Sequence, residues 1–126
     1  MIYNDSEEYK IKFYVNPRND SNPVREYILD QSPKDLAKIL KYIEFLRQRN
    51  GVLDEPYSKH IRGKLRELRV DFSNNRHRIF YFTFVGKNII LLHVFRKDTA
   101  KTPELEIIKA ENNLNQIINN EASYVD

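Results

Sequence analysis

Residues 65–103 constrain the fold most, because they contain three β-strand patterns separated by only two short connections. The three runs, 65–72, 76–82 and 89–97, are rich in Val, Ile, Leu, Phe and Tyr, and such composition favours strands. Ser-Asn-Asn at 73–75 and Gly-Lys-Asn at 86–88 separate the runs, and these residues tolerate the backbone angles of tight turns. The segment therefore predicts a three-stranded antiparallel meander.

Helix signals flank the meander on both sides. Asn22 and Ser32 are each followed by Pro, and this pairing is typical of a helix start, because Asn and Ser cap a helix and Pro fits its first turn. Asp35 completes an approximate capping box in the second helix, which Gly51 is expected to end. The apolar stripe of that helix consists of Leu36, Ile39, Leu40, Ile43 and Leu46. A last helix begins at Thr-Pro-Glu, 102–104, and its stripe consists of Ile107, Ala110, Leu114 and Ile117.

The remaining segments complete an α+β fold. Alternating apolar residues at 9–15 predict a strand, whereas 52–63 contains Pro and Gly and is expected to lack regular structure. The order strand, helix, helix, three strands, helix fits a mainly antiparallel sheet packed by a helical hairpin and a C-terminal helix. With 126 residues, we expect a single domain over residues 1–126 that frays at 1–8 and 120–126.

Composition excludes several classes of protein. A hydrophobic content of 40% argues for a folded chain, and the absence of cysteine excludes disulfides and thiolate metal sites. No apolar run approaches the roughly 20 residues needed to span a membrane, and no signal peptide opens the chain, so a cytoplasmic protein is expected. Because metal-ligand spacing, Gly-rich phosphate loops and nucleophile elbows are missing, we expect neither a metal nor a cofactor.

Positive charge is concentrated in the meander. Residues 59–97 contain ten Lys and Arg against two acids, a net charge of +8, whereas the rest of the chain carries −5. Strand alternation and antiparallel pairing predict that Arg69, Arg78 and Lys97 converge, with His93 nearby. Clustered cations suit the phosphates of a nucleic acid. Further contacts to nucleic acid are expected from Lys59, Arg62, Lys64, Arg66, Arg76, Phe95 and Arg96, of which Phe95 could stack on a base.

Two plainer interpretations remain open for these residues. The arginines could be solvated strand residues that pair with Glu67 and Asp71, which lie on the same predicted strand. His93 stands among apolar residues, where a histidine is commonly a packed, hydrogen-bonded part of the core. The sequence therefore leaves structural roles open beside the functional ones.

Four short motifs in order resemble the HigB-type toxins of the RelE/ParE superfamily, in the branch called phage Gp49-like. They are Leu-Arg-Glu-Leu-Arg at 65–69, Arg-Ile-Phe-Tyr-Phe at 78–82, Leu-His-Val-Phe-Arg-Lys at 92–97 and Lys-Thr-Pro at 101–103. The resemblance extends from about residue 9 to residue 110. It implies a RelE-like fold and a ribosome-dependent mRNA endoribonuclease that needs no metal, inhibits translation and growth, and is silenced by a helix-turn-helix, HigA-like antitoxin.

The resemblance also implies roles for individual residues. Arg69 and Arg78 match strand cations that hold the substrate phosphates, and Lys97 matches a basic residue after the last strand. His93 joins them as a candidate for proton transfer, because an imidazole titrates near neutral pH. The chain departs from the pattern at Asp98, where a second basic residue is common, and at Arg66, where a Tyr is common. Two alternatives remain: a ParE-like inhibitor of DNA gyrase, and a non-catalytic nucleic-acid-binding module.

Overall fold

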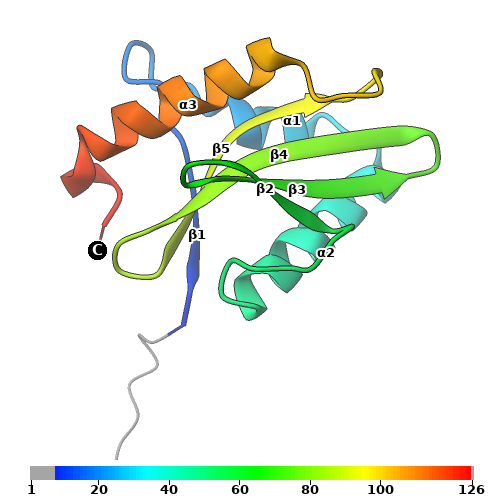
Figure 1. Cartoon of the computed structure of the whole chain (residues 1–126), viewed down its shortest axis with the longest axis horizontal. Helices are drawn as coiled ribbons and strands as arrows, with labels where there is room; N and C mark the ends of the chain where they lie inside the picture. The colour runs from blue at the N-terminus through cyan, green and yellow to red at the C-terminus, as the bar shows by residue number, and fades with distance from the viewer. Residues whose placement is uncertain (1–7, 126) are drawn as a thin grey trace, which may run out of the picture.

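Three consecutive antiparallel strands, β3 (Leu65–Phe72), β4 (Asn75–Phe84) and β5 (Asn88–Arg96), form the centre of the computed structural model, which describes residues 8–125 (Figure 1). β1 (Lys10–Phe13) joins β5 in parallel, and β2 (Ser58–Arg62) joins β3 antiparallel, giving the order β1-β5-β4-β3-β2. The helices are α1 (Pro23–Leu29), α2 (Pro33–Gln48) and α3 (Glu104–Ile118). The predicted α+β class, meander and mainly antiparallel sheet are confirmed.

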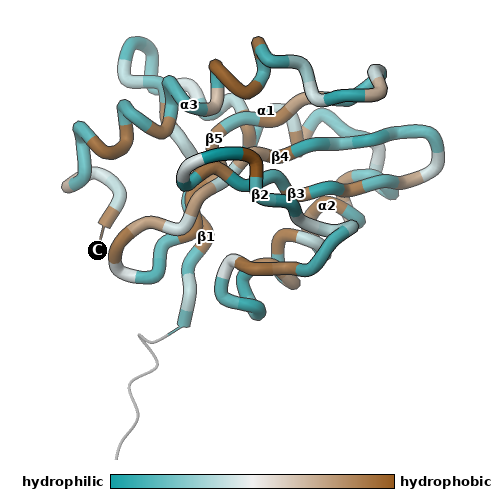
Figure 2. The backbone as a smooth tube through the Cα atoms, in the orientation of Figure 1, coloured by the Kyte–Doolittle hydropathy of each residue, from teal (hydrophilic) through white to brown (hydrophobic). Residues whose placement is uncertain are grey.

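β4 is the core of the sheet, because its middle residues are buried on both faces. Ile79, Phe80, Tyr81 and Phe82 are fully buried. A β-bulge interrupts the pairing of β4 with β5, since Phe80 pairs with His93 whereas Tyr81 pairs with Leu91. The extra residue puts two consecutive β5 side chains, those of residues 92 and 93, on the face that α3 covers. Figure 2 shows that the middle of β4 and β5 is apolar, whereas the far end of the β3–β4 hairpin is hydrophilic.

The predicted caps are present in both helices of the hairpin. The Asn22 side chain accepts a hydrogen bond from the backbone N of Arg25, and the Ser32 side chain accepts one from the backbone N of Asp35. Two details of α2 differ from expectation. Asp35 is only 3% exposed and binds residues of β4, and Leu40, placed in the apolar stripe, is 50% exposed.

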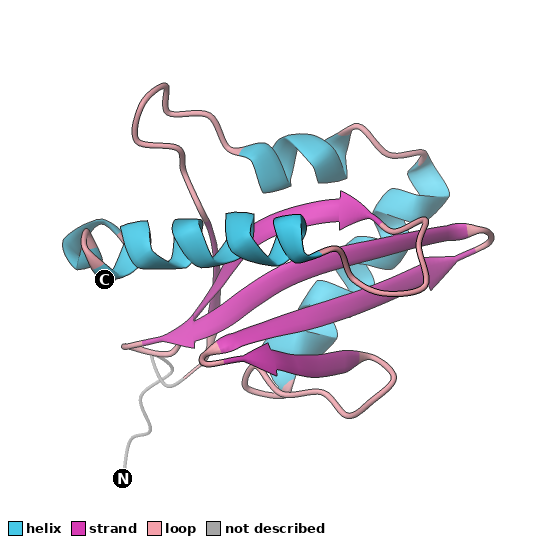
Figure 3. Cartoon of the chain, turned by 45° about the horizontal axis from the view of Figure 1, so that its top comes forward, coloured by secondary structure: helices cyan, strands magenta, loops and turns pink. Residues whose placement is uncertain are grey.

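Two apolar layers hold the helices on opposite faces of the sheet (Figure 3). The α1–α2 hairpin packs Val24, Ile28, Ile39, Ile43 and Leu46 against Leu68, Val70, Ile79, Tyr81, Ile89 and Leu91. On the other face, α3 packs Ile107, Ala110, Leu114 and Ile117 against Leu65, Phe80, Phe82, Ile90 and Leu92. All four residues of the predicted α3 stripe are therefore core. α3 does not reach the far end of the β3–β4 hairpin, which extends past the loop before the helix (Figure 1).

Two segments differ from the expectations for irregular structure. The region expected to lack regular structure contains the edge strand β2, whose polar sequence Ser-Lys-His-Ile-Arg has no alternation and is held by its pairing with β3. After α3 the chain forms a short 3-10 helix, η2 (Glu121–Ser123), and Tyr124 is 7% exposed, with its hydroxyl accepting a hydrogen bond from Val15 N at 3.0 Å. Residues 1–7 and 126 lie outside the described residues.

Candidate active site

The candidate site lies on the α3 face of the sheet, beyond the start of α3. Antiparallel pairing sets Arg69 directly opposite Arg78, and Arg78 directly opposite Phe95 on β5. Like charges in directly opposite positions destabilise a sheet. In this pair each guanidinium turns to a carboxylate instead, Arg69 to Glu67 and Arg78 to Asp71. The charges of Glu67, Arg69 and Asp71 alternate along β3, and the two arginines remain side by side on one surface.

Glu67 is the buried acid of the site, and it binds two of the neighbouring side chains. Its side chain is fully buried, and a buried carboxylate is costly unless donors satisfy it. The Nε of Arg69 donates to one oxygen at 3.1 Å, and the hydroxyl of Thr102 donates to the other at 3.0 Å. The Thr102 bond ties the loop before α3 to β3. It therefore joins two of the sequence motifs, Leu-Arg-Glu-Leu-Arg and Lys-Thr-Pro, in one contact.

Two hydrogen bonds fix the guanidinium of Arg78. Its Nη1 donates to Asp71 Oδ1 at 2.6 Å and to the carbonyl of His77 at 3.1 Å. Only 5% of the residue is exposed, so Arg78 is buried and not solvated, although it does pair with Asp71 as the plainer interpretation of the arginines allowed. The reason is that Arg78 lies on the central strand, with neighbouring strands on both sides. Its buried Nε makes no hydrogen bond to any described residue.

Lys97 follows β5 and lies within the electrostatic reach of three arginines. Its backbone N donates to the carbonyl of Arg76 at 2.8 Å, which fixes the start of the loop against β4. Partial burial, followed by repulsion from Arg78 and, more weakly, from Arg69 and Arg76, lowers the pKa of the Lys97 ammonium, while Glu67 opposes the shift. A lysine of lowered pKa releases its proton more readily than an ordinary surface lysine.

His93 lies on the same face, and its pair with Phe80 is two residue pairs along the sheet from the pair of Arg78 with Phe95. Its ring stacks on Phe80 and on Phe95, with centroid distances of 6.3 and 6.2 Å. Its Nε2 donates to Oε1 of Glu106 on α3 at 2.6 Å. The carboxylate orients the ring, and in the neutral tautomer that carries its proton on Nε2, Nδ1 is the proton acceptor. The side chain is 18% exposed.

The other expected nucleic-acid contacts are divided between the two faces. Arg76, Phe95 and Lys59 lie on the face of the candidate site, Lys59 opposite Glu67 on the edge strand, and Lys64 is exposed in the β2–β3 turn. The structure does not bring Arg62, Arg66 and Arg96 into this group. Arg62 binds Glu104 and Glu111 of α3 at 2.7 and 2.6 Å, which raises its pKa. Arg66 and Arg96 lie on the opposite face, near Tyr81 and Tyr27.

Comparison with known proteins identifies the family of the chain. The family described as "Phage derived protein Gp49-like" matches residues 26–115, a span that contains all four candidate catalytic residues. The chain belongs to this family. Two proteins of Mycobacterium tuberculosis, from strains CDC 1551 / Oshkosh and ATCC 25618 / H37Rv, are each named "Probable endoribonuclease HigB1". Each is 33% identical over 88 residues, which cover 70% of this chain and 69% of the relative. The resemblance to HigB-type toxins is thereby confirmed.

Four residues of the candidate site escaped the sequence reasoning: Glu67, Asp71, Thr102 and Glu106. Glu67 and Asp71 were considered only as partners that might neutralise arginines, and nothing in the local sequence separates the fully buried Glu67 from Asp71, whose side chain is 59% exposed. Thr102 and Glu106 gave no local signal, because their partners lie 35 and 13 residues away in sequence. These acids and donors position the cations and the histidine.

Two further findings concern cofactors and membranes. Within residues 8–125, no three His, Asp or Glu side chains of this Gp49-like chain are arranged to hold a metal ion. Among the same residues, no helix is both long enough and apolar enough to cross a membrane.

Proposed function

We propose that this Gp49-like chain is the toxin of a type II toxin–antitoxin module and that it cleaves mRNA on the ribosome in the cytoplasm, arresting translation and growth. The observation that carries this proposal is the convergence of Arg69, Arg78, Lys97 and His93 on one face of the sheet. The names of the two mycobacterial relatives support an endoribonuclease in particular. RNA would lie along the exposed end of the β3–β4 hairpin.

The reaction proposed is cleavage by the substrate's own ribose. The 2′-oxygen loses its proton and attacks the adjacent phosphorus, the bond from phosphorus to the 5′-oxygen breaks, and that oxygen gains a proton. The products are a 2′,3′-cyclic phosphate and a 5′-hydroxyl. The extra negative charge of the pentavalent transition state needs fixed cations. Arg78 suits this role because its partners Asp71 and the His77 carbonyl orient the guanidinium before RNA arrives.

The two proton transfers are assigned to His93 and Lys97. His93 donates Nε2–H to Glu106, which orients the ring and leaves Nδ1 of the neutral imidazole as the acceptor for the 2′-hydroxyl proton. The lowered pKa of Lys97 suits it to donate a proton to the departing 5′-oxygen. Arg69, held by Glu67, and Arg76 contribute binding to the flanking phosphates.

Mapping RNA ends tests the proposal. We expect the purified chain, added to a reconstituted translation reaction, to produce new 5′-hydroxyl ends inside translated messages and none in the same RNA without ribosomes. His93→Gln should abolish the new ends while the chain stays folded. DNA breaks in the presence of gyrase would favour the ParE-like alternative instead. RNA binding without new ends would favour a non-catalytic module.

A free toxin of this kind would harm its host, so the proposal includes an inhibitor. The expected partner is a helix-turn-helix, HigA-like antitoxin encoded beside the toxin. Co-expression of the two chains should give a complex on gel filtration and should restore growth. If the chain elutes alone, the antitoxin part of the proposal fails.

A further inference from the structure

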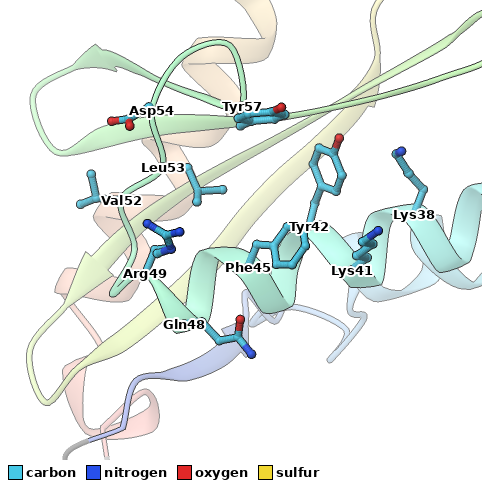
Figure 4. Close-up of a pocket in the computed structure, with 10 residues that line it drawn as sticks. All are labelled: Lys38, Lys41, Tyr42, Phe45, Gln48, Arg49, Val52, Leu53, Asp54 and Tyr57. Carbon is cyan, nitrogen blue, oxygen red and sulfur yellow. The ribbon is translucent and has the colours of Figure 1, made fainter.

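A second surface lies between α2 and the segment before β2, where a depression of about 500 Å3 opens (Figure 4). Tyr42 and Phe45 rise from α2 toward the segment that carries Leu53 and Tyr57 (Figure 4). The depression lies on the α2 side of the sheet. The carbonyl of Tyr57 accepts a backbone hydrogen bond from Arg69 at 2.8 Å, yet the Arg69 side chain belongs to the α3 face, so β3 separates this surface from the candidate active site.

Several large apolar side chains of this surface are exposed to solvent. Phe45 is 42% exposed, Tyr57 is 49% exposed and Val52 is 57% exposed. The Tyr42 ring lies 5.8 Å from the Tyr57 ring and 6.1 Å from the Phe45 ring, so the aromatic groups form one continuous cluster. Contiguous apolar patches on a protein surface commonly mark an interaction site.

Positive charge rims the depression. Lys38, Lys41 and Arg49 stand there against a single acid, Asp54, and none of the four is in an ion pair within residues 8–125. The Lys38 ammonium lies 5.4 Å from the centre of the Tyr42 ring, and that of Lys41 lies 5.7 Å from the centre of the Phe45 ring. The two lysines are three positions apart and share one face of α2. Acids spaced by one helical turn would complement them.

We propose that this depression binds an acidic amphipathic helix of a partner protein. Two or three apolar side chains of that helix would enter the depression, and its Asp or Glu residues would face Lys38 and Lys41. The exposed rings of Phe45 and Tyr57 could also stack on RNA bases, so RNA is the alternative that the experiment below tests. The inference rests on the proposed function, since the partner is the expected antitoxin. It puts the contact on the α2 side of the sheet, away from the cations that would bind RNA.

Titration calorimetry with the helix-turn-helix protein encoded beside this chain tests the inference. Phe45→Asp should weaken binding by at least about thirtyfold, as expected for a central aromatic anchor. Lys38→Glu combined with Lys41→Glu should also weaken it. Ile118→Asp is the matched control, because Ile118 is likewise 42% exposed but lies at the end of α3, and its affinity should equal that of the parent. Thermal melting checks that each variant is folded.

The outcomes separate this inference from the proposed nuclease. The Phe45→Asp variant should still cleave mRNA in the translation reaction while the partner no longer neutralises it. Unchanged affinity in that variant, or no complex with the parent chain, overturns the inference. The inference is also overturned if the variants lose affinity for a single-stranded RNA oligonucleotide while their affinity for the partner protein is unchanged. A parent chain that binds through Phe45 but cuts no RNA would support the docking surface and refute the proposed function.

Discussion

At the scale of single residues, Arg78 carries the sharpest prediction about activity. Replacing it with Ala should lower the cleavage rate on the order of a hundredfold, roughly 3 kcal/mol of barrier, because one preorganised charge donor is lost. Its burial adds a stability cost of about 1–3 kcal/mol. Arg78→Lys should restore little activity, since an ammonium cannot reproduce the guanidinium fork. Rates would be measured by single-turnover cleavage in the translation reaction.

Lys34→Ala provides the control for Arg78, because Lys34 is exposed on α2, on the opposite side of the sheet from the candidate site. That variant should cleave at the parent rate. If Arg78→Lys were folded and fully active, Arg78 would be a structural arginine that serves Asp71 and the β4 backbone, and the assignment would be wrong.

Asp35 carries a prediction about pH. Hydrogen bonds from His77, at 2.8 Å, and from Asn75 lower the pKa of this carboxyl, against the opposing effect of burial. Because the folded pKa is lower than the unfolded one, Asp35 stabilises the fold above about pH 4 and loses that contribution as the pH falls through its folded pKa. Asp35→Asn should therefore cost about 2 kcal/mol at neutral pH, and less in acid. Asp98→Asn is the control: because Asp98 is exposed, this substitution should leave the free energy of unfolding unchanged. Urea unfolding across pH measures both.

At the scale of an element, the end of α2 depends on Gly51. Its φ is +84°, and a Cβ added there would lie 2.4 Å from the Thr83 hydroxyl oxygen on β4. Gly51→Ala should therefore destabilise the fold by about 2–3 kcal/mol, combining backbone strain with a clash. Gly63 in the β2–β3 turn has a φ of +56° with open space around it, so Gly63→Ala should cost only about 1 kcal/mol. Equal losses in thermal melting would refute the packing argument.

At the scale of the whole molecule, the uneven charge predicts how RNA affinity responds to salt. If about four cations of the α3 face meet phosphates, log affinity should fall with log salt with a slope of about −3 for single strands. Arg76→Ala should reduce the slope by about 0.7. Fluorescence anisotropy between about 50 and 200 mM salt measures it. If Arg76→Ala left the slope unchanged, the RNA would have to bind elsewhere. Lys34→Ala is the control and should leave the slope unchanged.

Local rules determined much of this protein from its sequence. Turn residues and strand composition predicted the meander, and Asn22 and Ser32 predicted two helix starts, because these signals act between residues close together in the chain. The alternation of strand side chains also placed Arg69 and Arg78 on one face, since that period is a property of the backbone.

Tertiary structure decided what depends on distant partners. β2 has no apolar pattern and exists because β3 offers it a hydrogen-bonding edge. Because side chains alternate along β3, Arg69 lies beside Arg78 on the α3 side of the sheet, whereas Arg66 lies on the α2 side. Arg62 forms ion pairs with two carboxylates of α3. Asp35, read as a helix-cap residue, is a buried partner of His77, which is 42 residues away. The sequence shows where the charged residues stand in the chain. It does not show which of them face solvent, neutralise one another or line a site, because that depends on packing between segments that come together only on folding.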